Sequence, residues 1–109
     1  MKLPKLKYWY HATSIEKAHE IVWAGYIKPS FDGIYFANSS QYAGGFMRMR
    51  GLEEWVTFKI PRDRLDAKQL FLGQDHNPSF YPKDLVVAQY DGGIVFVNEE
   101  DCLVYEAAE

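Results

Sequence analysis

The fold of this chain depends on one stretch, which reads Gly33-Ile34-Tyr35-Phe36-Ala37-Asn38-Ser39-Ser40-Gln41-Tyr42-Ala43-Gly44-Gly45-Phe46. Its apolar first part predicts a short strand, because aromatic and β-branched side chains fit a pleated, half-buried surface. Asn38-Ser39-Ser40 predicts the end of that strand, since these side chains favour turns and helix caps. A short helix of small residues then leads to Phe46. We therefore expect two aromatic rings, Tyr35 and Phe46, at one end of a sheet, where a flat aromatic ligand fits between them.

The segment before this stretch predicts a strand followed by a helix. Tyr8-Trp9-Tyr10 is typical of a strand, which we expect to end at His11. Thr13 and Glu16 have the spacing of a capping box, and helical spacing of apolar residues predicts a helix from about Ser14 to Ala24. Gly25 then stands where a left-handed cap glycine is expected.

The segments after it predict further strands and one long loop. Glu54–Ile60 alternates and is the clearest strand, while 47–51 is expected as a loop or frayed helix end. Residues 62–72 are expected as a turn-rich or helical connection, and 73–82 as a loop of the kind that often forms a lid or binding loop. Short strands are expected near 84–90, 94–97 and 102–105, with a turn at Asp91-Gly92-Gly93. This element order predicts a single α+β domain, residues 1–109, with two small packed sheets, one main helix and one or two short ones.

Composition excludes several classes of protein. With 48% hydrophobic and 17% aromatic residues, the chain has the composition of a folded globule. The single Cys102 rules out an internal disulfide and a zinc site built from cysteines. The sequence holds no apolar run of about 18 residues, so we expect no membrane span and a cytoplasmic location, with a monomer as the default state.

The net charge of −3 argues against a molecule that is basic all over and binds nucleic acid nonspecifically. A local basic patch is still compatible with the sequence. Residues 1–7 alternate apolar and basic side chains, and six more basic residues lie between 48 and 68: Arg48, Arg50, Lys59, Arg62, Arg64 and Lys68. The alternative interpretation is an ordinary solvated face.

Three ordered segments resemble the ADP-ribosyltransferase superfamily, in its branch with a His-Tyr-Glu or His-Tyr-Asp triad. These are Tyr10-His11-Ala12-Thr13, the stretch from Gly33 to Phe46, and the acidic cluster before the last strand. Together they span residues 8 to 105. The resemblance implies a split β-sandwich of two sheets, NAD+ as the substrate, and no metal. It also implies transfer of a single ADP-ribose to a macromolecular acceptor, a protein or a nucleic acid, as in small toxins and phage effectors.

The resemblance assigns roles to residues of the first two segments. His11 would bind the 2′-hydroxyl of the nicotinamide ribose, and Ala12 and Thr13 would contact the same region. Ala12 replaces the family's usual glycine. Tyr35, followed by Phe36, would stack on the nicotinamide, and Phe46 would cover its other face. Ala43 occupies the place of a small residue, commonly serine, that binds the carboxamide. Taken alone, these aromatic residues are more typical of an ordinary core.

The third segment, Asn98-Glu99-Glu100-Asp101, supplies the carboxylate. In the family, an acid at the start of the last strand stabilises the cation that forms as nicotinamide departs, and such a contact contributes several kcal/mol. Glu100 and Asp101 are both candidates for this role. Taken alone, three adjacent carboxylates are typical of an exposed turn.

Two alternatives share the fold. An RNA 2′-phosphotransferase-like enzyme also uses NAD+, but it needs basic residues for the phosphate. A non-enzymatic binding domain is favoured by the alanines at positions 12 and 43. Other chemistries lack their signatures, because the sequence holds no nucleophile elbow, no P-loop and no dinucleotide-binding glycine pattern.

Overall fold

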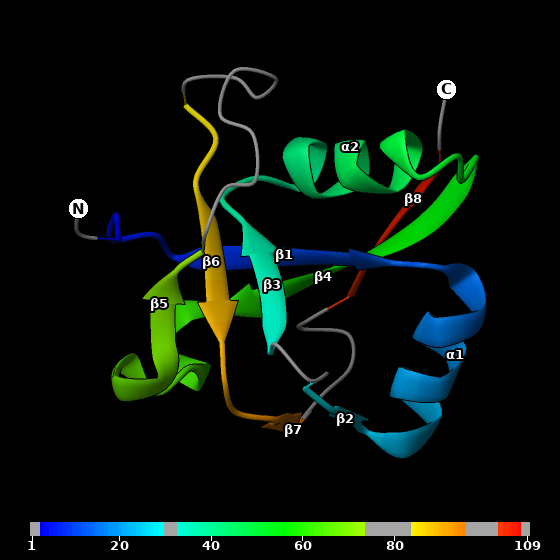
Figure 1. The fold of residues 1–109 in the computed structure, drawn as a ribbon. Helices are drawn as coiled ribbons and strands as arrows, with labels where there is room; N and C mark the ends of the chain where they lie inside the picture. The colour runs from blue at the N-terminus through cyan, green and yellow to red at the C-terminus, as the bar shows by residue number, and fades with distance from the viewer. Residues whose placement is uncertain (1–2, 30–32, 74–83, 96–102, 108–109) are drawn as a thin grey trace.

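The computed structural model describes residues 3–29, 33–73, 84–95 and 103–107, and these form a small α+β domain (Figure 1), as predicted. Its elements follow one another in this order: β1 (Tyr8–Thr13), α1 (Ile15–Ala24), β2 (Tyr26–Ile27), β3 (Ile34–Ala37), α2 (Ser40–Met49), β4 (Glu54–Pro61), the 3₁₀ turns η1 (Arg62–Arg64) and η2 (Ala67–Gln69), β5 (Leu70–Leu72), β6 (Val87–Tyr90), β7 (Ile94–Val95) and β8 (Leu103–Ala107).

The main sheet has six strands in the order β5-β6-β3-β1-β4-β8, and β2 and β7 form a separate pair. All the pairings are antiparallel. β1 pairs with β4 along its whole length, but its register with β3 consists of the single pair Tyr10↔Ala37. The sheet therefore has two three-stranded halves joined at one point. Figure 1 shows β1 and β4 running across the view while β3 and β6 run up and down.

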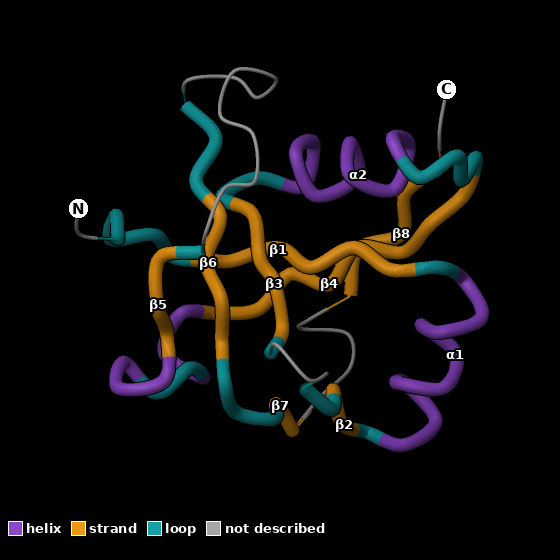
Figure 2. The backbone as a smooth tube through the Cα atoms, viewed as in Figure 1, coloured by secondary structure: helices purple, strands orange, loops and turns teal. Residues whose placement is uncertain are grey.

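The two helices cover opposite faces of this sheet. Strand alternation points Val56, Phe58 and Ile60 of β4 into one core, which includes Trp9 of β1 and the buried face of α1. Trp55, which precedes Val56, points to the other face. There it belongs to a second cluster, which α2 covers with Ala43 and Met47. Figure 2 shows the two helices on separate sides of the strands.

The first strand and its helix differ from expectation by a few residues. β1 does not end at His11, because Ala12 and Thr13 continue to pair with Thr57 and Val56 of β4. The predicted Thr13 cap is wrong for the same reason, since that residue still belongs to the strand. The cap is Ser14, whose side chain accepts a hydrogen bond from the Lys17 backbone N–H at 3.1 Å.

α1 ends as predicted at Gly25. This glycine has φ +70°, and its backbone N–H donates to the carbonyl groups of Ile21 and Val22.

The second helix is longer than predicted. Ser39 caps it by accepting a hydrogen bond from the Tyr42 backbone N–H at 3.1 Å. The helix then continues through Met49, where a loop or frayed end was expected. Met47 is 7% exposed in the second cluster, and burial of its side chain stabilises the last turn.

The segments after β4 confirm the expected connection at 62–72 and the short strands that follow it. Residues 62–72 form two 3₁₀ turns and the strand β5. The expected loop lies mostly outside the described residues. The strands expected near 94–97 and 102–105 correspond to β7 and β8. Residues 96–102 also lie outside the described residues. Neither α1 nor α2 is long and apolar enough to cross a bilayer, within the part of the chain that the structure describes.

Candidate functional site

His11 joins the first two of the three segments that carry the sequence resemblance. It lies in β1 and is partly buried, and its Nδ1 is 2.8 Å from the backbone carbonyl oxygen of Tyr35 in β3. Its ring also meets the Phe36 ring edge-on, with the centroids 6.0 Å apart and the planes at 71°. A carbonyl oxygen only accepts hydrogen bonds, so Nδ1 carries the proton. In the neutral ring, Nε2 is then left with a lone pair that accepts a hydrogen bond.

Burial lowers the pKa of His11, and the hydrogen bond to Tyr35 opposes this shift only in part. The ring is therefore neutral near pH 7. A neutral imidazole with Nδ1–H engaged is suited to accept a hydrogen bond from a hydroxyl group through Nε2.

The lowered pKa predicts a pH dependence of stability. The unfolded His11 has the higher pKa, so its contribution to stability is complete above about pH 6.5 and is lost as the pH falls through the folded pKa. We expect the loss of stability between pH 7.5 and 5 to be smaller in His11→Asn than in wild type. Urea unfolding at each pH measures it. The control is His19→Asn at an exposed position of α1, which should follow wild type; equal curves for both variants would contradict the prediction.

His11 and Tyr35 lie where the two halves of the sheet separate. Beyond the pair Tyr10↔Ala37, β1 continues toward Thr13 on β4 alone. The His11 side chain bonds the Tyr35 carbonyl of β3 instead. The hydrogen bond from the His11 side chain to the Tyr35 carbonyl thus joins β1 and β3 next to their single registered pair.

The two side chains lie on opposite faces of the sheet. Register places Tyr35 and Ala37 on the face of Tyr10, whereas His11 shares the face of Phe36. The resemblance predicts one crevice lined by the rings of His11 and Tyr35, and this arrangement is wrong, because the two side chains point to opposite faces. Phe36 is 1% exposed in the first core, so it is a core residue that holds the imidazole in place.

α2 brings the remaining candidates of the first two segments together. Ala43 is 2% exposed and belongs to the second cluster with Ala12 and Ala37, and Phe46 packs against the same cluster. Tyr35, Ala12 and Phe46 are thus on one face of the sheet. Thr13 ends β1 and is partly buried.

α2 approaches the sheet closely because Gly44 has no side chain. A Cβ at this position would lie 2.7 Å from Nε1 of Trp55. The Arg48 guanidinium lies over the same indole, 5.8 Å from its centroid.

The acidic candidates, Glu100 and Asp101, lie outside the described residues. The chain after them enters the sheet at Leu103, which pairs with Phe58, and Phe58 also pairs with His11. The start of β8 is therefore in the same cross-strand row as His11, about two strand spacings, or roughly 10 Å, away.

Asn38, Tyr42 and Asp84 form a polar connection that the sequence did not reveal. The Asn38 amide donates to the Asp84 carbonyl oxygen at 2.8 Å and accepts from the Val86 backbone N–H at 3.0 Å. The Tyr42 hydroxyl donates to the Asp84 carboxylate, and this bond raises the pKa of Tyr42. These contacts hold the start of the β6 segment against α2. The sequence signal at Asn38 indicated only a turn.

Other features of the described residues do not add to this site. A hollow of about 330 Å³ lies at the start of α1 and β4, and its lining, Ile15, Glu16, Leu52, Glu53 and Glu54, includes none of the candidates. Within the described ranges, no three His, Cys, Asp or Glu side chains are grouped so as to hold a metal ion.

Comparison with known proteins adds no relative. No family model matches the chain, and neither a curated protein nor a solved structure matches it.

Proposed function

We propose that this protein is an NAD+-dependent mono-ADP-ribosyltransferase with the split β-sandwich of that superfamily. The hydrogen bond from His11 to the Tyr35 carbonyl carries the proposal, because it joins the two resembling segments at the point where the sheet divides. The weak registration between β1 and β3 supports two half-sheets with a ligand between them. The acceptor is a macromolecule, the location is the cytoplasm, and the activity suits a toxin or a phage effector.

In this mechanism the nicotinamide ribose lies beside the junction of β1 and β3. Nε2 of His11 accepts a hydrogen bond from the ribose 2′-hydroxyl. The nicotinamide packs on the other face of the sheet, between Tyr35 and Phe46, and backbone groups beside Ala12 bind its carboxamide. Because His11 and Tyr35 lie on opposite faces, this mechanism requires the ligand to pass between β1 and β3 beyond the pair Tyr10↔Ala37.

The bond that breaks joins ribose C1′ to the pyridinium nitrogen, and its electron pair leaves with neutral nicotinamide. The positive charge that develops on the ribose is stabilised by a carboxylate, Glu100 or Asp101. A nucleophile on the acceptor then bonds to C1′ and releases its proton to solvent. No metal takes part.

The test is to incubate the protein with NAD+ labelled in its adenylate half and a cell lysate. We expect label on a macromolecule with wild type and loss of labelling with His11→Ala and Tyr35→Ala. Trp23→Ala is the control, because this side chain is 93% exposed on α1. Wild-type protein that transfers no label and releases no nicotinamide would exclude the enzyme.

A binding domain without turnover is the second candidate. It is favoured by Ala12 and Ala43, whose methyl groups are buried where the family has glycine and commonly serine. Calorimetry with NAD+ separates the two, since the second candidate binds NAD+ without releasing nicotinamide.

A further inference from the structure

The charge of this chain is divided very unevenly. Residues 3–8 and 59–69 hold six basic side chains and only two acidic ones, Asp63 and Asp66, although the whole chain has a net charge of −3. These two segments lie together. β1 and β4 pair at Tyr8↔Pro61, and the Arg62 backbone N–H donates to the Lys7 carbonyl at 2.8 Å. One end of an acidic protein is therefore positive, and it attracts a polyanion.

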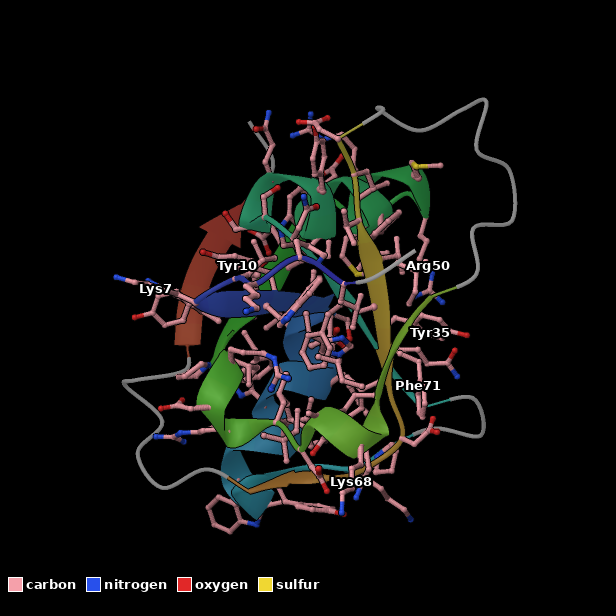
Figure 3. The ribbon with its side chains drawn as sticks, turned by 90° about the vertical axis from the view of Figure 1, so that its left-hand side faces the viewer. Lys7, Tyr10, Tyr35, Arg50, Lys68 and Phe71 are labelled. Atoms are coloured by element: carbon pink, nitrogen blue, oxygen red, sulfur yellow. The ribbon has the colours of Figure 1, made fainter. Side chains whose placement is uncertain are left out.

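Aromatic rings lie among these cations. The Lys59 ammonium lies over the Tyr8 ring, 4.1 Å from its centroid, and Lys59 pairs across the sheet with Tyr10. At the edge of the main sheet, β5 begins two residues after Lys68 and presents Phe71, which is 49% exposed. Figure 3 shows Lys7 at the left of the view, Lys68 at the bottom and Phe71 at the right.

We propose that this surface, the basic end (Lys5, Lys7, Tyr8, Lys59, Lys68 and Phe71), binds a single-stranded nucleic acid. Exposed lysines suit the phosphates, and an exposed aromatic ring on a strand stacks with an unpaired base. A duplex offers phosphates but no free base faces, and an acidic protein lacks the regular spacing of phosphates along a strand. The combination of cations and rings therefore favours the single strand.

The basic end also continues toward the candidate site. Phe71 and Tyr35 both pair with Gln89 of β6, from opposite sides, so the three residues form one row across the sheet. A strand bound at Phe71 would lie about two strand spacings, roughly 10 Å, from Tyr35. Binding itself does not depend on the proposed enzymatic activity, and it is measured without NAD+.

The test is fluorescence anisotropy with labelled 20-nucleotide single-stranded DNA and RNA of mixed sequence, at 50 and 200 mM salt. We expect wild type to bind at least one of them and the double variant Lys7→Ala/Lys68→Ala to bind at least tenfold more weakly. The salt slope should fall by about 1.4, or about 0.7 for each lost phosphate contact. The control is Lys17→Ala/Lys28→Ala, which removes the same charge elsewhere and should bind like wild type.

Phe71 distinguishes base stacking from simple charge attraction. Phe71→Leu keeps an apolar side chain on β5 and should weaken binding about tenfold, whereas Phe71→Trp should retain it. Thermal melting of each variant checks the fold. The proposal is overturned if wild type binds neither oligonucleotide, if heparin and a DNA duplex bind as tightly as the single strand, or if Phe71→Leu binds like wild type.

Discussion

His11→Asn should fold like wild type and release nicotinamide from NAD+ about 10²–10³ times more slowly. The Asn side chain places an N–H near the position of Nδ1, so the hydrogen bond to the Tyr35 carbonyl is kept. It has no atom at the position of Nε2, which is the group that we propose binds the ribose hydroxyl. Loss of one such contact in the transition state typically costs about 3–4 kcal/mol. Initial rates of nicotinamide release, measured by chromatography, check the prediction.

Two companion variants separate binding of the ribose from support of the strands. His11→Ala loses both hydrogen bonds, so it should be as inactive as His11→Asn and also less stable by about 1 kcal/mol. His19→Asn changes an exposed histidine and should keep full activity. Wild-type rates in His11→Asn would show that the imidazole serves only to hold β1 near β3.

The second large effect concerns stability and the position of α2. Gly44→Ala should destabilise the protein by about 1–3 kcal/mol, because its new methyl group would lie 2.7–2.9 Å from atoms of the Trp55 indole. That indole is 5% exposed and has little room to move. Gly45→Ala should instead stabilise the protein by about 0.5–1 kcal/mol, since nothing lies within 4 Å of its Cβ and alanine favours a helix.

Urea unfolding of both variants measures the difference. The two substitutions are chemically the same and neighbour each other in one helix, so effects on the unfolded chain largely cancel. Equal stabilities would mean that α2 packs less closely on β4 than the structure shows. If Gly44→Ala also slows NAD+ cleavage while Gly45→Ala does not, the position of α2, and with it Phe46, matters for the proposed site.

The sequence predicted which segments lie near each other, but not how their side chains are arranged. The segments around His11 and Tyr35 were singled out by a family resemblance, and the structure brings them together. The sequence did not predict that the side chains of His11 and Tyr35 lie on opposite faces, because side-chain direction depends on the register between β1 and β3. The partners of Asn38 were equally inaccessible, since Asp84 and Val86 are more than 40 residues away in the sequence.

Local chemistry by itself determined the α+β class, the strands of alternating residues, the serine before α2 as its cap and the glycine that ends α1. These features follow from backbone geometry and from neighbours within a few residues. Only the tertiary structure decided that β1 continues past His11, that α2 reaches Met49 and that the basic segments at 3–8 and 59–69 meet. Each of these depends on pairing or burial against a distant element, and the free energy of such contacts outweighs local preference.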